Sequence, residues 1–205
     1  AVERLNRLRE LFFNDEFSTG TSRIPVIRQS TTAKFRSYAE NARWEVGNVM
    51  FATINLPASN NHYRTEAGRN SEFEDRLIAN RDWLQRIFTF AHRKKMAGVV
   101  LFCDGDPLTK IGAAQFFDFG AKRDGFSEIR QHILMQASKF GGKVLLVHGK
   151  SVANDKASDK DDIIWNNNLG DLTVGSGWVK LNVNPSNSTL FTLDQEPTDT
   201  PNSRQ

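Results

Sequence analysis

Residues 143–149 read Lys-Val-Leu-Leu-Val-His-Gly, and this short apolar run is the clearest sign of fold class in the chain. Four consecutive apolar residues, with glycines on both sides, predict a strand that is buried on both faces, as in a parallel sheet. His148 falls at the carboxyl end of that strand. Because α/β folds place their chemistry at the carboxyl ends of parallel strands, His148 is the first candidate site residue. The alternative is a histidine that only hydrogen-bonds at a strand end.

The segments before this strand indicate the same fold class. Apolar spacing predicts a long helix over residues 71–95, with Ser71 and Glu74 as its capping box. Residues 98–102 form a second short apolar run, and residues 127–139 again have helical spacing. The alternation of helix, strand, helix and strand predicts a parallel pair of strands joined by right-handed crossovers.

The remaining segments add a first helix and several antiparallel strands. They are a helix at 2–13, an irregular stretch at 14–40, a hairpin within 43–56, and antiparallel strands within 171–183 and 189–193. We expect one domain over residues 1–194 and a polar, disordered tail over 195–205. Because the first helix has no N-cap residue, we also expect that a segment precedes Ala1.

The composition is that of an ordinary globular protein. The chain has 205 residues, of which 39% are hydrophobic and 25% are charged, which suits one domain with a substantial core. The net charge is +3, and basic residues are interleaved with acidic ones, so nucleic-acid binding is not indicated. No apolar run approaches the roughly 18 residues of a membrane span. The single cysteine, Cys103, excludes an internal disulfide and any multi-cysteine zinc site.

Acidic side chains follow the strand at 98–102. Asp104 and Asp106 lie at its carboxyl end, and together with His148 they would converge on one cleft if the two strands are adjacent. Two carboxylates and an imidazole would suit a divalent metal ion. The competing interpretation is that Asp106 only starts a turn. We expect Cys103 to be a buried small side chain and not a nucleophile.

A polar loop follows the second strand of the predicted hairpin. It contains Asn60, Asn61 and His62, again on the carboxyl side of a strand. Amide and imidazole groups at that position could hold a metal ion or a phosphate oxygen. The alternative is an ordinary polar loop that binds nothing.

Several segments, taken in order, resemble one known family. They are Glu3-Arg4-Leu5 with Leu8 to Phe13, Asn41-Ala42-Arg43-Trp44, Ser59-Asn60-Asn61, Glu72-Phe73-Glu74 with Asn80 to Leu84, and Val144 to Gly149. Over residues 1–193, their order and spacing are similar to the C-terminal two-thirds of a bacterial-type calcineurin-like metallophosphoesterase. The resemblance implies a mixed-sheet sandwich flanked by helices, here without its N-terminal strands. It also implies two metal ions at the carboxyl ends of the strands, which would activate water to attack a phosphate ester.

The resemblance transfers few metal ligands to this chain. His148 with Gly149 matches the start of a His-Gly-x-x-His motif, but the second histidine would fall at Val152, which cannot bind a metal. Where the family often has another histidine, this chain has Cys103 and Asp104. The resemblance therefore implies His148 and Asp104 as metal ligands. The family's first metal motifs would lie before Ala1.

Two functions are compatible with this partial match. The first is metal-dependent phosphoester hydrolysis, with divalent metal ions whose missing ligands come from an unseen segment or a partner. Asn60, Asn61 and His62 would then lie near the substrate. The second is a non-catalytic binding or structural role on a degenerate phosphoesterase scaffold.

The resemblance also has implications for partners and location. An N-terminal fragment, a partner chain or a second copy of the chain would cover the sheet edges that missing strands leave open. We expect neither nucleic acid nor membrane as a partner, and the resemblance favours a secreted or extracellular protein.

Overall fold

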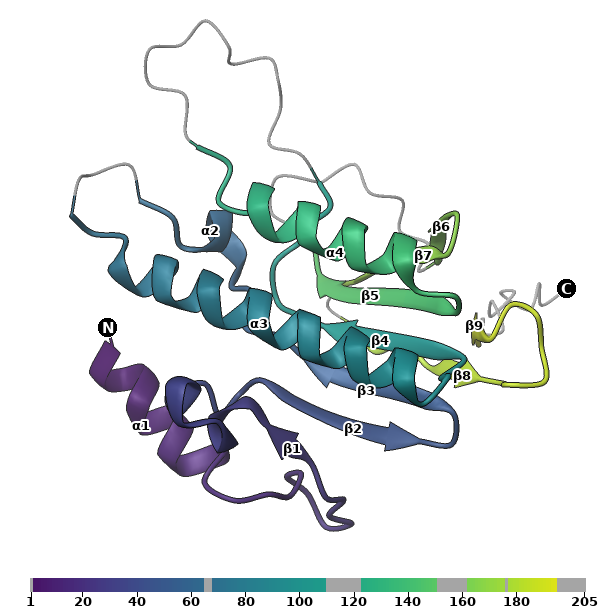
Figure 1. Cartoon of the computed structure of the whole chain (residues 1–205), viewed down its shortest axis with the longest axis horizontal. Helices are drawn as coiled ribbons and strands as arrows, with labels where there is room; N and C mark the ends of the chain where they lie inside the picture. The colour runs from purple at the N-terminus through teal and green to yellow at the C-terminus, as the bar shows by residue number, and fades with distance from the viewer. Residues whose placement is uncertain (1, 65–67, 110–122, 151–161, 176, 195–205) are drawn as a thin grey trace, which may run out of the picture.

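The chain forms a mixed β-sheet with helices packed against it (Figure 1). The computed structural model describes residues 2–64, 68–109, 123–150, 162–175 and 177–194. The helices are α1 (Val2–Phe12), α2 (Ala58–Asn61), α3 (Ser71–Arg93) and α4 (Ser127–Lys139), with 3-10 turns η1 (Gln29–Thr31) and η2 (Ala33–Phe35). The strands are β1 (Ile27–Arg28), β2 (Ala42–Val46), β3 (Val49–Thr53), β4 (Gly98–Phe102), β5 (Lys143–Gly149), β6 (Ile164–Asn166), β7 (Leu169–Val174), β8 (Leu181–Val183) and β9 (Phe191–Leu193).

The main sheet has seven strands in the order β1-β2-β3-β4-β5-β7-β6. Strands β3, β4, β5 and β7 run parallel, while β1, β2 and β6 pair antiparallel with their neighbours. The predicted α/β class, the hairpin and the parallel pairing of the 98–102 and 143–149 strands are confirmed. Because β4 and β5 are neighbours, the segments that follow them lie at the same edge of the sheet.

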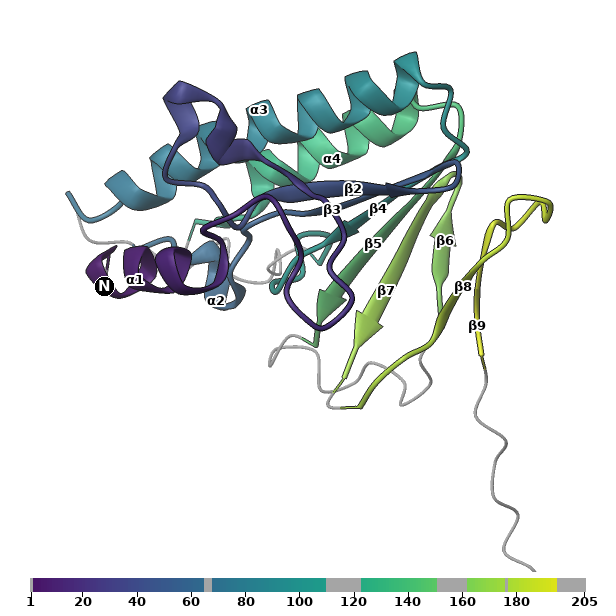
Figure 2. The same cartoon turned by 90° about the horizontal axis from the view of Figure 1, so that it is seen from below.

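Helices α3 and α4 cover one face of this sheet (Figure 2). The apolar face of each helix packs on side chains that point to the same side of the strands, such as Leu101 of β4 and Leu146 of β5. Both of these leucines are fully buried. No helix in the described part of the chain is both long and apolar enough to cross a membrane.

The opposite face is covered in part by the two-stranded sheet β8-β9 (Figure 2). Leu190 and Phe191 pack there against Val100 and Leu145. Gly98 permits this close approach, because a Cβ atom at this position would lie only 2.6 Å from Leu190 Cδ2. The second sheet of the predicted sandwich thus consists, among the described residues, of two strands.

Two details of the predicted elements are corrected by the structure. The capping box of Ser71 and Glu74 is wrong: the helix begins at Ser71, and Asn70 is the N-cap residue. The Asn70 side chain instead bonds to the backbone of Arg64, so it closes the preceding loop. The antiparallel strands expected within 171–183 are β7 and β8: β8 pairs antiparallel with β9 as expected, but β7 joins the main sheet and runs parallel to β5. The predicted tail over 195–205 lies outside the described residues.

A buried polar network joins the N-terminal segment to the sheet and to α3. Asn41 is fully buried and donates to Gln29 Oε1 at 2.8 Å and to Asn80 Oδ1 at 3.0 Å. Its own side-chain oxygen accepts a hydrogen bond from the Asn55 amide at 2.7 Å. Asn80 in turn donates to the Asn55 carbonyl. One amide side chain therefore connects η1, the segment that follows β3, and α3.

Replacing Asn41 tests how much this network stabilises the fold. We expect Asn41→Ala to lower the free energy of unfolding by about 3 kcal/mol, because it leaves buried groups of Gln29, Asn80 and Asn55 unpaired. Urea unfolding followed by circular dichroism measures the change. The control is Asn6→Ala on exposed α1, which should stay within about 0.5 kcal/mol. Equal stability of the two variants would contradict the assignment.

Candidate functional site

His148 is buried at the carboxyl end of β5 and is held at both ring nitrogens. Its Nδ1 lies 2.8 Å from the carbonyl oxygen of Gly149, and its Nε2 lies 2.9 Å from Asp171 Oδ1. Asp106 Oδ1 is 3.7 Å from the same Nε2. A carbonyl oxygen and a carboxylate are both acceptors, so this geometry favours a ring that donates from both nitrogens.

The surroundings of His148 favour that charged form. Burial disfavours the imidazolium and would lower the pKa, but the hydrogen bonds to Asp171 and Gly149 and the charge of Asp106 outweigh burial. The pKa of His148 is therefore raised above its ordinary value of 6.5. The ring is thus held by a carbonyl at Nδ1 and faces two carboxylates at Nε2.

Asp106 is fixed by the loop that follows β4. Its Oδ1 accepts hydrogen bonds from the backbone amides of Leu108 and Thr109, at 2.9 and 3.0 Å. Burial would raise the pKa of Asp106, but hydrogen bonds from Thr109 and the charge of His148 lower it below the ordinary 3.8. Asp106 thus starts a turn and also faces His148, so the interpretation that it only starts a turn is too narrow.

Asp171 is the site residue that sequence reasoning missed. It lies in the middle of β7, where it pairs in register with Leu146 of β5. The parallel pairing turns its side chain to the same face of the sheet as His148, two positions further along β5. The sequence does show an acidic residue inside a strand pattern. That residue becomes a site candidate only once β7 is known to lie next to β5.

Asp104 lies near His148 in the fold, but its carboxylate makes a contact with another segment. Its carboxylate accepts a hydrogen bond from the Ala58 amide at 2.9 Å, which anchors the start of α2. Its backbone carbonyl accepts a bond from the Gly149 amide at 3.0 Å. A Cβ atom at position 149 would lie 2.9 Å from that carbonyl oxygen, so the two strand ends meet backbone to backbone. The structure thus places Asp104 beside the His148 cluster, with its carboxylate engaged elsewhere.

Cys103 is a neutral thiol in this environment. Burial, followed by the negative charges of Asp106, Asp104 and Asp171, strongly raises its pKa. Its Sγ donates to the carbonyl oxygen of Gly105 at 3.2 Å. This agrees with the prediction that Cys103 is an unreactive small side chain.

Asn60, Asn61 and His62 lie on a left-handed turn, not on an open ligand-binding loop. With Ser59 before them, they form four consecutive residues with φ between 52° and 57°. Such residues cost free energy unless other contacts hold them. Gly125 provides part of that support, because its lack of a side chain lets the Asn60 carbonyl approach closely.

The two asparagine side chains stabilise this turn. Asn60 accepts from the Gly125 amide at 2.8 Å and donates to the Arg123 carbonyl at 2.9 Å. Asn61 is buried, donates to the Gly125 carbonyl at 3.0 Å, and accepts from the guanidinium of buried Arg76. His62 is exposed. The structure therefore brings Asn60 and Asn61 to the start of α4 and does not direct their amides to His148.

The described residues fit part of a metal centre. A neutral His148, with Nδ1–H on the Gly149 carbonyl, would present Nε2 to an ion, with Asp171 and Asp106 beside it. However, no group of three or more His, Cys, Asp or Glu side chains is arranged to hold a metal ion within the described ranges. Val152, where the family motif would have its second histidine, lies outside those ranges. A two-metal centre would need ligands beyond these residues.

Comparison with known proteins adds no further constraint. The chain matches no protein-family model, no curated protein and no solved structure.

Replacing Asp171 tests the charged state of His148. We expect Asp171→Asn to lower the pKa of His148, because the variant loses the negative charge at Nε2. Since the folded pKa lies above the unfolded one, the pair stabilises the fold fully below about pH 6.5 and loses this effect as the pH rises through the folded pKa. The variant should therefore lose about 1–3 kcal/mol of stability at acidic pH and less at alkaline pH.

Proton NMR titration of the histidine rings measures the pKa, and urea unfolding at several pH values measures the stability. The control is Asp75→Asn on an exposed position of α3. An unchanged His148 pKa in Asp171→Asn would rule out this effect of Asp171.

Replacing Ser59 tests the strain of the left-handed turn. Ser59 has no side-chain hydrogen bond to any residue that the structure describes, and its φ is 57°. We expect Ser59→Gly to raise the free energy of unfolding by about 0.5–1 kcal/mol, because glycine adopts this conformation without steric cost. The control Ser37→Gly, at an exposed position outside the turn, should not stabilise the protein. Thermal unfolding of both variants decides the question, and a destabilised Ser59→Gly would contradict it.

Proposed function

We propose that this chain is a metallophosphoesterase-type domain that contributes to metal-dependent phosphoester hydrolysis at the carboxyl edge of its parallel strands. His148 is its metal ligand, and further ligands come from a segment or partner beyond the described residues. The single observation that carries the proposal is the environment of His148. Its Nδ1 is fixed by a carbonyl, and its Nε2 faces two carboxylates.

This arrangement suits a proton or a cation at Nε2. Metal-binding histidines commonly donate their other ring nitrogen to a carbonyl or a carboxylate, which fixes the ring orientation. Because the proton and a metal ion would compete for the same nitrogen, binding should strengthen as the pH rises through the pKa of His148. The metal, when bound, would supply the Lewis acid and the activated water that phosphoester hydrolysis requires.

A second function is favoured by a different observation. Three of the other predicted site residues, Asp104, Asn60 and Asn61, use their side chains for contacts within the fold. A non-catalytic binding role on the same scaffold needs none of them to be free. The two functions differ in whether His148 binds a metal ion.

Manganese binding by the full chain separates the two functions. We expect Mn²⁺ to broaden the NMR signals of His148 before those of His92, which is exposed in the last turn of α3. The apparent affinity should rise with pH. In the native assembly, His148→Ala should reduce Mn²⁺-dependent hydrolysis of p-nitrophenyl phosphate by about 10–100-fold, whereas His92→Ala should leave it unchanged.

Two results would count against His148 as the metal ligand. Equal broadening of all histidine signals, without hydrolysis, would favour the non-catalytic binding role. Hydrolysis that His148→Ala leaves unchanged would place the activity elsewhere in the assembly.

A further inference from the structure

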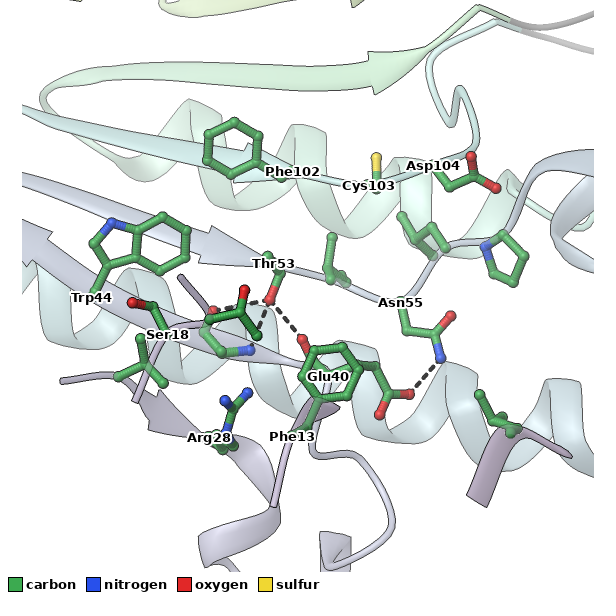
Figure 3. Close-up of a pocket in the computed structure, with 17 residues that line it drawn as sticks. Phe13, Ser18, Arg28, Glu40, Trp44, Thr53, Asn55, Phe102, Cys103 and Asp104 are labelled. Atoms are coloured by element: carbon green, nitrogen blue, oxygen red, sulfur yellow. Dashed lines mark hydrogen bonds between the residues drawn. The ribbon is translucent and has the colours of Figure 1, made fainter. Parts of the chain in front are cut away.

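A cavity of about 600 Å³ lies on the face of the sheet opposite α3 and α4 (Figure 3). Its floor is formed by the ends of β2, β3 and β4, and its other side by the segment that follows α1. Asp104 and Pro57 lie at the end nearest the carboxyl edge. The volume is in the range of small-molecule sites, which is about 300–1,000 Å³.

The sheet side of this cavity is aromatic. Trp44 stacks on Phe102, with ring centroids 6.1 Å apart and planes inclined by only 6°. Phe51 also stacks on Trp44, at 5.7 Å and 13°. All three side chains are only partly buried. Two of these rings, Trp44 and Phe102, line the cavity and offer apolar surface to a planar ligand.

The opposite side carries a buried positive charge. Arg28 is 6% exposed, and Figure 3 shows its guanidinium turned toward the interior of the cavity. It donates to the backbone carbonyls of Asp15, Ala39 and Phe17, the latter two at 3.0 and 2.9 Å. Among the described residues no carboxylate forms an ion pair with Arg28. The negative charge of Asp15 acts on the pKa of Arg28, but the Asp15 carboxylate forms its ion pair with Arg23.

Two acidic residues, Glu40 and Asp104, also line the cavity, and Glu40 is already neutralised. Glu40 accepts two hydrogen bonds from the guanidinium of Arg9, at 2.8 and 2.6 Å, and one from the Asn55 amide. Asp104 lies at the end nearest the carboxyl edge, with its carboxylate on the Ala58 amide, and Arg28 is the cation among the described residues that line the cavity. A buried guanidinium has five N–H donors and is stabilised by an anion that brings both charge and acceptors.

We propose that this cavity binds a small aromatic anion, with its planar ring against Trp44 and Phe102 and its anionic group directed to Arg28. The site requires neither a bound metal nor hydrolysis. It is therefore independent of the function proposed for His148. An apolar side chain of a polypeptide would fill the aromatic part but would leave the charge of Arg28 unmet.

Two probes of equal shape test the proposal on the unaltered protein. They are 2-naphthoate, which carries a carboxylate, and 2-naphthamide, which is neutral. We expect saturable binding of both by isothermal titration calorimetry, with the naphthoate bound at least about tenfold more tightly. Equal affinities would overturn the role of Arg28. No saturable binding of either probe up to about 10 mM would overturn the site itself.

Variants then assign each half of the ligand. Arg28→Gln should weaken naphthoate to the level of naphthamide, while the exposed control Arg36→Gln should change neither affinity. Trp44→Leu should weaken both probes, while Trp178→Leu, at a residue that is 72% exposed and outside the cavity, should weaken neither. If Trp44→Leu binds both probes as the unaltered protein does, the aromatic contact is wrong. Should Arg28→Gln fail to fold, the comparison of the two probes on the unaltered protein still decides the charge.

Discussion

The parallel alignment of β3, β4, β5 and β7 is the constraint on which the rest of the structure depends. It places the carboxyl ends of these strands at one edge, and backbone hydrogen bonds continue beyond the strands themselves. The Ile54 amide bonds to the Phe102 carbonyl, the Cys103 amide to the Val147 carbonyl, and the Gly149 amide to the Asp104 carbonyl. The candidate site is thus positioned by main-chain contacts, which do not depend on which side chains are present.

The order and type of the central elements could be predicted because their signals are local. An uninterrupted apolar run such as residues 143–149, or apolar residues at helical spacing, fixes an element without knowledge of its neighbours. Pairing is not local. Nothing in the sequence of β7 distinguishes a strand parallel to β5 from one in the small sheet. The assignment of β7 and β8 to different sheets could therefore not be predicted. The capping box failed because the Asn70 side chain closed a loop instead.

The candidate site was predictable to the same extent. His148 and Asp106 follow neighbouring parallel strands, so their approach could be inferred from the edge they share. Asp171 could not be found, since its position depends on the pairing of β7. Asn60 and Asn61 show the opposite difficulty. An amide that binds a ligand and an amide that supports a left-handed turn look the same in a sequence, and only the contacts with Gly125 and Arg76 distinguish them.

The unequal covering of the sheet's two faces has a consequence for its motions. Strands β4 and β5 lie between the helices on one side and the β8-β9 residues Leu190 and Phe191 on the other. Strand β2 contributes Trp44 to an aromatic row on the second face, and this row is only partly covered. Amide hydrogens should therefore exchange slowest in β4 and β5 and faster toward β2. The histidine cluster lies on the part of the sheet that opens slowly. The cavity lies over the part toward β2, where local opening is faster. A ligand could therefore enter the cavity without disturbing His148.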